Sequence, residues 1–277
     1  MLIRVTISKM PSTDIVQEFD SIEDTIQAFS VLHPDPSKLP PIPTLLHTSR
    51  SLTSYSPPTE NGEFIIVLDD FSRENEGDLI IAASDITPSK MAFMIRHTSG
   101  LICTPMASSL TTHLSLPLMV PDSFNEDPNR TAYTVSVDAN SPEMTTGISA
   151  HDRALTCRML ASPDAKKEDF RRPGHVFPLR AREGGVRERG GHTEAAVEFC
   201  RLAGKEREVG VICEMVEDGE EDGEGGAVRV GGGMMRRDGC LAFGRRWGLR
   251  VCTIEDLVAY VERTEGKWVK RVPNGTK

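Results

Sequence analysis

The chain has 277 residues, 38% of them hydrophobic, and a formal net charge of −9. This composition allows a substantial core, and the acidic balance disfavours a nucleic-acid binder recruited by general electrostatics. The longest strictly apolar runs are five residues, far short of the roughly 20 that cross a bilayer, so no membrane span is expected. The six cysteines are scattered without a CxxC pair, which predicts reduced thiols in a cytoplasmic protein.

The N-terminal part predicts one helix between two irregular segments. A capping-box-like pattern begins at Ser21, and apolar residues then recur on one helical face over residues 22–30. Residues 31–60 hold seven prolines and five serines with little periodicity, which is typical of a looped or disordered insertion. Residues 1–18 are expected to form a flexible N-terminus, and residues 266–277 a C-terminal tail.

The next two elements flank a strongly charged stretch. Residues 64–68 and 79–83 are apolar and predict two short buried strands. Between them, the stretch VLDDFSRENEGDLIIAAS places five carboxylates and one arginine in ten residues. So many carboxylates repel one another, and a hard divalent cation such as magnesium would remove the repulsion. A solvated turn whose charge is balanced by Arg73 and other basic neighbours explains the pattern equally well.

Caps and alternating patterns predict the remaining elements. They are a helix from Thr87 and Pro88 to residue 95, strands at residues 101–106, 133–138, 209–213 and 249–252, a helix stopped by Gly248, and helices that begin at Ser149 and Thr253. Residues 217–224 carry six acids in eight residues and predict a solvated loop. Because strands and helices are interspersed throughout, we expect a single α/β (α+β) domain over residues 19–265.

Two further motifs carry possible chemistry. RPGHVFPLRA places His175 before a strand-like run, although a lone histidine is more often a structural or surface residue. RGGHTEAAVEFCRLAG places Gly190 and Gly191 before a helix, whose open backbone N–H groups and dipole favour an anion such as phosphate. Arg189 and Thr193 would add a charged fork and a hydroxyl. Two glycines before a helix are also ordinary turn chemistry, so the pattern alone leaves both interpretations open.

Taken together, the motifs resemble one enzyme family. DDFSRENEGDLI, TTGISAHDRALTCRML, RPGHVFPLRA, RGGHTEAAVEFCRLAG and GVICEM occur in the order and approximate spacing of 3,4-dihydroxy-2-butanone 4-phosphate synthase, a riboflavin-pathway enzyme. The resemblance covers residues 19–30 and 62–260 and is closest to the fungal, single-function form. It implies a three-layer α/β sandwich with a mixed β-sheet. It also implies a lyase that converts D-ribulose 5-phosphate to L-3,4-dihydroxybutan-2-one 4-phosphate and formate, through enolisation, skeletal rearrangement and loss of C4.

The resemblance also implies roles for individual residues. Glu74 and His192 match the ligands of a magnesium or manganese ion, and His175 and Glu214 match residues that the family needs for catalysis. The implied substrate contacts are Arg73, Glu74, Asp78, Cys103, Thr146, Arg189, Gly190, Gly191, His192, Thr193 and Glu214. The family forms homodimers with sites near the subunit interface, so we expect the chain itself as a partner, and neither nucleic acid nor membrane.

Three departures from the family pattern accompany these matches. Before Tyr133 the family usually reads close to His-Gly-Thr-Ala, where this chain has Asn129-Arg130-Thr131-Ala132. Residues 31–60 interrupt a helix-to-strand connection, and the acidic, glycine-rich loop at residues 217–233 is longer than usual. Two alternative functions remain, a non-catalytic dimeric homologue and a metal-dependent sugar-phosphate isomerase or aldolase. Formate separates them, because only the synthase releases it.

Overall fold

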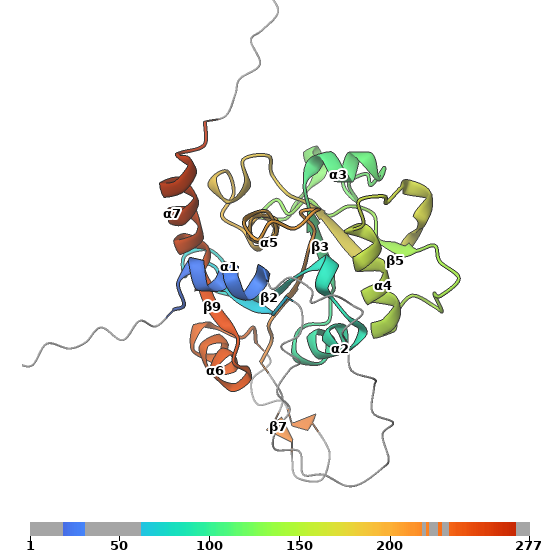
Figure 1. Ribbon diagram of the computed structural model, residues 1–277. Helices are drawn as coiled ribbons and strands as arrows, with labels where there is room; N and C mark the ends of the chain where they lie inside the picture. Colours follow the sequence, from blue (N-terminus) through green and yellow to red (C-terminus); the bar gives the residue numbers. More distant parts are fainter. Residues whose placement is uncertain (1–18, 31–61, 218–219, 222–226, 229–232, 270–277) are drawn as a thin grey trace, which may run out of the picture.

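A seven-stranded mixed sheet forms the centre of the computed structural model, which describes residues 19–30, 62–217, 220–221, 227–228 and 233–269 (Figure 1). The strand order is β4-β5-β3-β6-β2-β1-β9. The strands are β1 (Ile65–Leu68), β2 (Gly77–Ala82), β3 (Cys103–Met106), β4 (Val137–Ala139), β5 (Phe170–Arg180), β6 (Gly210–Glu214) and β9 (Arg250–Thr253). The β1–β9 and β3–β5 pairs are parallel, and the other neighbours are antiparallel.

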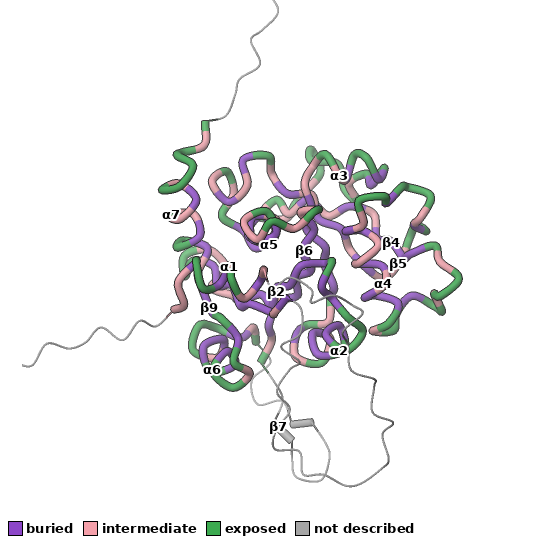
Figure 2. Tube along the Cα trace, viewed as in Figure 1, coloured by how far each residue is buried: buried purple, intermediate pink, exposed green. Residues whose placement is uncertain are grey.

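Helices cover both faces of this sheet. The first layer contains α1 (Ile22–Ser30), α5 (His192–Leu202) and α7 (Ile254–Glu265), and the second contains α2 (Pro88–His97), α4 (Ala150–Leu160) and α6 (Arg237–Trp247). Because successive strand side chains point to opposite faces, Ile65 and Ile80 pack under the first layer and Ile66 and Leu79 under the second. Figure 2 shows the central strands buried and the outer helix faces exposed. The predicted three-layer α/β sandwich with a mixed sheet is confirmed.

Local capping explains where the helices begin and end. The hydroxyls of Thr87, Ser149 and Thr253 each accept a hydrogen bond from a backbone N–H in the first turn of α2, α4 and α7. The helix α6 ends at Gly248, whose φ of 67° is the left-handed conformation that glycine adopts without steric cost. These four helix boundaries confirm the predictions from sequence.

The strand predicted at residues 133–138 is wrong in extent. Only β4, Val137–Ala139, forms a ladder there, while Tyr133 and Thr134 make isolated bridges. Tyr133 bridges to Leu179 and Thr134 to Leu118, so the alternating residues pair with two different segments and do not form one strand. A short helix, α3 (Ser108–His113), was not predicted from sequence.

The acidic tract also differs in part from its prediction. Glu220–Glu221 forms the strand β7, which pairs antiparallel with β8, Ala227–Val228, where the sequence predicted a solvated loop. The predictions for residues 1–18 and 31–60 lie outside the described residues. Within the described part of the chain, no helix combines the length and the apolar character that a membrane crossing requires.

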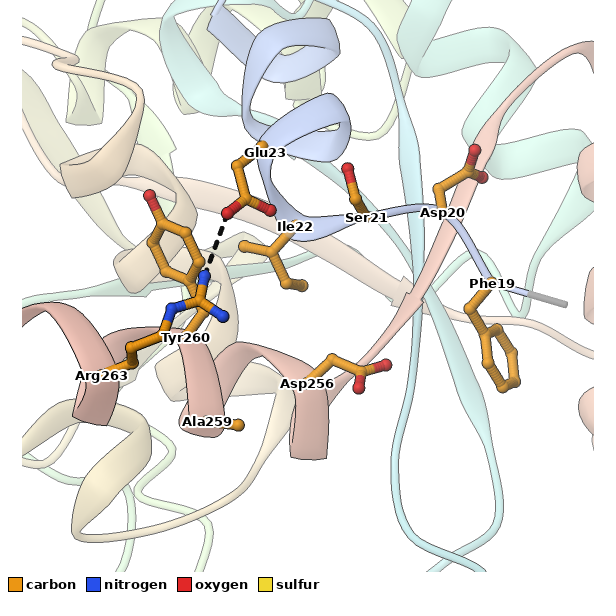
Figure 3. Close-up of a pocket in the computed structure, with 9 residues that line it drawn as sticks. All are labelled: Phe19, Asp20, Ser21, Ile22, Glu23, Asp256, Ala259, Tyr260 and Arg263. Atoms are coloured by element: carbon orange, nitrogen blue, oxygen red, sulfur yellow. Dashed lines mark hydrogen bonds and ion pairs between the residues drawn. The ribbon is translucent and has the colours of Figure 1, made fainter. Parts of the chain in front are cut away.

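The start of α1 is fastened to α7 and β9 around a small pocket (Figure 3). Glu23 and Arg263 form an ion pair of 3.0 Å across this pocket. Asp20 accepts hydrogen bonds from the Arg250 side chain and the Val251 backbone. Asp20 and Glu23 thus hold the start of the first helix against β9 and α7.

Candidate active site

The acidic stretch forms a tight turn between β1 and β2 that is organised by Asp69. Its Oδ2 accepts hydrogen bonds from the Glu74 backbone at 3.2 Å and from Arg73 Nη1 at 2.6 Å. Its Oδ1 accepts one from the Glu76 backbone at 2.8 Å, and its side chain is fully buried. Asp69 therefore holds the backbone of the turn, which explains how one carboxylate is accommodated against the core.

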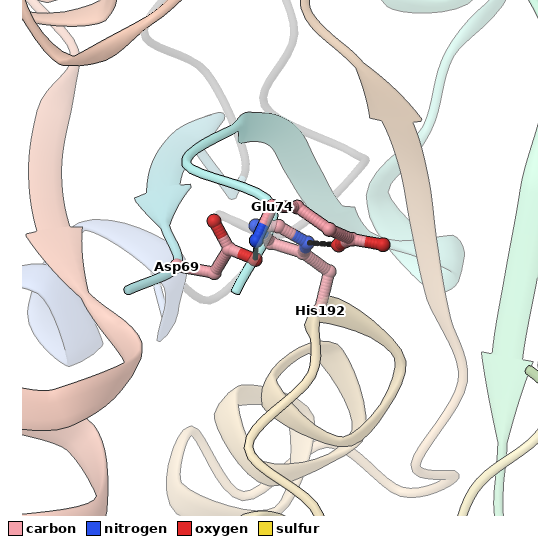
Figure 4. Close-up of side chains that lie close together, drawn as sticks. All are labelled: Asp69, Glu74 and His192. Carbon is pink, nitrogen blue, oxygen red and sulfur yellow. Dashed lines mark hydrogen bonds and ion pairs between the residues drawn. The ribbon is translucent and has the colours of Figure 1, made fainter. Parts of the chain in front are cut away.

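Glu74 on this turn faces His192 at the start of α5 (Figure 4). One potential ligand atom from each of Asp69, Glu74 and His192 lies within 4.8 Å of the others. His192 Nε2 is 3.1 Å from the Val67 carbonyl oxygen, to which it donates, so Nδ1 carries the free lone pair. This Nδ1 lies 4.0 Å from Glu74 Oε2 and 3.8 Å from Asp78 Oδ1. Burial lowers the pKa of His192, which favours the neutral imidazole that binds metals.

The carboxyl group of Asp78 lies beside His192, and one of its oxygens has no hydrogen-bond donor among the described residues. Asp78 is 2% exposed, and this oxygen is Oδ1. Burial, together with the carboxylates of Glu214 and Glu74, raises the pKa of Asp78 well above its ordinary range. A buried polar atom without a partner is costly unless a cation or a donor meets it. The carboxylates of Glu74 and Asp78, together with His192 Nδ1, therefore offer a set of donor atoms that fits a divalent cation.

Arg189 lies at the start of α5 in a fixed orientation. Its Nη1 donates to Glu194 Oε2 at 2.6 Å, its Nε to the Asn129 carbonyl at 3.1 Å, and its Nη2 to Thr131 Oγ1 at 3.1 Å. Three of the five guanidinium N–H groups are thus used internally. Gly191 is the N-cap of α5, and the first backbone N–H groups of that helix have no acceptor within it. Gly190, Gly191, His192 and Thr193 thus place the open N–H groups of a helix N-terminus beside Arg189.

Glu214 and Cys103 extend the site along the sheet. Glu214 pairs with Asp78 across the β6–β2 ladder, and strand alternation directs it to the face covered by α5. Ser99 Oγ donates to Glu214 Oε2 at 3.0 Å. Cys103 is 1% exposed, and burial raises the pKa of its thiol well above the ordinary range. The thiol is therefore protonated at neutral pH.

His175 lies elsewhere on the same sheet. Its Nδ1 is 2.8 Å from Asp138 Oδ2, and its backbone N–H donates to Asp138 Oδ1 at 2.8 Å. The strands β3 and β6 lie between β5, which carries His175, and β2, which carries Asp78. Three strand spacings of about 4.8 Å separate the two residues by roughly 14 Å. One chain therefore does not bring His175 into contact with the Glu74–His192 pair.

Thr146 belongs with His175. A Cβ atom on the neighbouring Gly147 would lie 2.5 Å from His175 Nδ1, so the two segments are closely packed. Asp152 holds this loop by accepting hydrogen bonds from the Gly147 backbone at 3.0 Å and from the Thr145 hydroxyl. Thr146 itself is exposed. The predicted site residues thus form two groups, one around Glu74 and one around His175.

Several residues of the site were not predicted from sequence. They are Asp69, Ser99, Asn129, Thr131, Asp138 and Glu194. Asp69 and Glu194 lie within the same sequence motifs as Glu74 and His192, so their closeness in sequence to these two residues could have indicated them. The other four residues form hydrogen bonds with residues distant in sequence, and no local sequence pattern predicts such contacts.

Comparison with known proteins gives a consistent family. The family model of 3,4-dihydroxy-2-butanone 4-phosphate synthase matches residues 57–260. The synthase of Pyricularia oryzae is 59% identical over 260 residues, covering 93% of this chain and 97% of that protein. The synthase of Schizosaccharomyces pombe is 53% identical over 204 residues, covering 73% and 92%. A crystal structure of this enzyme in complex with two magnesium ions has a TM-score of 0.76 and 59% identity, and covers 90% of this chain and 100% of that chain.

The raised pKa of Asp78 predicts a pH-dependent stability. Because the pKa in the folded protein lies above the unfolded value of about 3.9, ionised Asp78 destabilises the metal-free fold, and stability is lost as pH rises above about 4. In chelator, the unsubstituted protein should therefore lose unfolding free energy relative to Asp78→Asn as pH rises from about 4 through the raised pKa of Asp78. Urea unfolding of both proteins at several pH values measures this, and a difference that does not change with pH would contradict it.

Proposed function

This chain belongs to the 3,4-dihydroxy-2-butanone 4-phosphate synthase family, and we propose that its reaction takes place at the Glu74–His192 centre. The reaction converts D-ribulose 5-phosphate to L-3,4-dihydroxybutan-2-one 4-phosphate and formate in riboflavin biosynthesis. One observation carries the location of the site. His192 Nδ1, fixed by the Val67 carbonyl, faces both Glu74 and Asp78 Oδ1, which has no hydrogen-bond donor among the described residues.

Glu74 and His192 would hold a magnesium ion, with Asp78 close to it. The magnesium ions in the 59% identical crystal structure support this choice of metal, and manganese stays a prediction. When bound there, the ion supplies positive charge that stabilises negative charge on substrate oxygens. Asp69 is less suited as a ligand, because its fully buried carboxylate accepts two backbone hydrogen bonds that hold the turn, whereas Glu74 is partly exposed and its donors are side chains.

Glu214 and His175 are the proposed proton carriers. Enolisation and rearrangement require protons to leave and return at neighbouring carbons, which a positioned carboxylate and imidazole can accomplish. Ser99 orients the Glu214 carboxylate. With its Nδ1–H directed to Asp138, His175 presents the Nε2 lone pair as the base.

The phosphate end of the substrate would bind at Arg189 and the start of α5. The two guanidinium N–H groups that remain, the helix N-terminus and the Thr193 hydroxyl offer charge-assisted hydrogen bonds to phosphate oxygens. Gly190 and Gly191 would allow close approach of the backbone. Arg73 and Cys103 would line the sugar end of the site.

A second copy of the chain would supply His175 and Thr146. Groups that exchange protons with adjacent carbons must approach them within about 3 Å. His175 on β5 and Glu214 on β6 are separated by β3, and two strand spacings of about 4.8 Å place them roughly 10 Å apart, which disfavours their meeting at adjacent carbons within one chain. Two large apolar side chains, Leu101 and Ile148, are 40% and 53% exposed close to these segments. Their exposure supports contact with another subunit there, and so a homodimer with shared sites.

Formate release tests the proposed activity directly. The unsubstituted protein should release formate from D-ribulose 5-phosphate with magnesium and stop when a chelator is added. Glu74→Gln and His192→Ala should each abolish release while the folded state persists, because each removes one of few protein ligands. Full activity in either variant would contradict the metal assignment, and turnover without formate would indicate an isomerase or aldolase.

Arg189→Lys should raise KM for the sugar phosphate more than it lowers kcat. Lysine keeps the charge but loses the planar fork, and a phosphate away from the reacting carbons contributes mainly binding. Lysine is preferable to alanine because Arg189→Ala would leave the buried Glu194 carboxylate unpaired. Arg187→Lys, at an arginine paired with Glu265, is the matched control. An unchanged KM in Arg189→Lys would place the phosphate elsewhere.

Mixing two inactive variants tests whether the sites are shared. Glu74→Gln and His175→Ala should each be inactive alone. After unfolding and joint refolding, half of the dimers are mixed, and each mixed dimer has one intact site out of two. Formate release should then recover to about one quarter of the unsubstituted rate. If each chain carried a complete site, the mixture would remain inactive.

A further inference from the structure

We propose that Asn129 is a positioning residue that holds the Glu74 carboxylate and couples it to Arg189. Asn129 lies in the loop of residues 125–131, at the position where the chain departs from the family pattern. This inference rests on the proposed function, since it concerns how the Glu74–His192 centre is held.

The first observation is a direct hydrogen bond to the carboxylate. Asn129 Nδ2 donates to Glu74 Oε1 at 2.5 Å, while Arg73 donates to the other oxygen, Oε2. Oε2 is also the oxygen that faces His192 Nδ1 at 4.0 Å. Asn129 thus holds the carboxylate from its outer side and leaves Oε2 directed into the centre. Outer partners of this kind orient a ligand and strengthen metal binding.

The second observation links the same residue to Arg189. The Asn129 carbonyl oxygen accepts from Arg189 Nε at 3.1 Å, and Thr131 Oγ1 accepts from Arg189 Nη2 at 3.1 Å. One short segment therefore contacts the Glu74 carboxylate through the Asn129 side chain, and the guanidinium through the Asn129 backbone and the Thr131 hydroxyl. A movement of this segment would displace both groups together.

The third observation is that hydrogen bonds within the loop fix its shape. Asp127 Oδ2 accepts from the Thr131 backbone at 2.7 Å, and Asn125 Nδ2 donates to the Thr131 carbonyl at 3.0 Å. Arg130 has a φ of 54°, which is unfavourable for a residue with a Cβ atom. Its guanidinium donates to the Asn125 carbonyl at 2.8 Å and stabilises that conformation. The loop therefore presents Asn129 in a preorganised position.

A purely structural role for Asn129 makes a different prediction. If the amide only tied the loop to the turn, its loss would lower the melting temperature and leave magnesium affinity unchanged. If it positions Glu74, its loss would weaken magnesium binding while the metal-free protein melts nearly as before. The two roles are therefore separated by measuring affinity and stability on the same variants.

The experiment titrates magnesium chloride into the full chain by calorimetry, without substrate. Asn129→Ala should bind magnesium about 10-fold more weakly than the unsubstituted protein, with a smaller rise in melting temperature on adding magnesium. Asn140→Ala is the matched control, because Asn140 is exposed and its amide donates to the Glu168 carbonyl, away from the centre. Asn129→Ser, whose side chain is too short to reach Glu74, replaces the alanine variant if that variant does not fold.

Three results would overturn the inference. They are a magnesium affinity of the Asn129 variant within about twofold of the unsubstituted protein, an equal loss in Asn140→Ala, and a lowered melting temperature without a change in affinity. If the unsubstituted protein neither binds magnesium nor releases formate, the proposed function fails as well. Formate release by the unsubstituted protein with unchanged magnesium affinity in Asn129→Ala would overturn the positioning role alone.

Discussion

Repulsion among the carboxylates of the β1–β2 turn is the constraint that organises this protein. Asp69 is balanced by backbone N–H groups and Arg73, and Glu74 by Arg73 and Asn129. Within the described residues, the Oδ1 of Asp78 receives no such donor, and it lies 3.8 Å from His192 Nδ1. One buried carboxyl group at the start of β2 is therefore left without a donor beside a neutral imidazole, and a divalent cation there would stabilise its ionised form.

Much of the fold was predictable because its signals are local. Capping residues such as Thr87 and Ser149 determine helix starts through bonds within one turn, so sequence alone located them. The extent of β4 was not predictable, since Tyr133 and Thr134 form isolated bridges to two different segments, at Leu179 and Leu118, and do not continue the ladder. Alternation at residues 133–138 reports which side chains are buried. It does not report which neighbouring strand accepts the hydrogen bonds.

The candidate site likewise contains residues that local motifs predict and residues that only long-range contacts bring into place. Motifs indicated Glu74, His192 and Arg189, because the residues proposed to bind the metal and the phosphate lie in short, specific sequence patterns. Their supporting partners are contributed by distant segments, as when Asn129 bonds to Glu74 across 55 positions of sequence. Long-range pairs of this kind follow from the packing of the whole domain. The separation of His175 from Asp78 likewise follows from strand order, which no single motif encodes.

The acidic tract can be long without disturbing the site because its two ends are held together. Val216 and Met234 form an antiparallel bridge, and the Glu217 N–H donates to the Gly233 carbonyl at 3.1 Å. Immediately after this bridge, Arg236 Nη1 donates to the carbonyls of Glu74 and Asn75 at 2.5 and 2.8 Å. Arg236 thus contacts the β1–β2 turn at the same place whatever the number of residues between Glu217 and Gly233. Since closure entropy grows only slowly with loop length, additional residues there cost little, and the backbone of Glu74 stays in place.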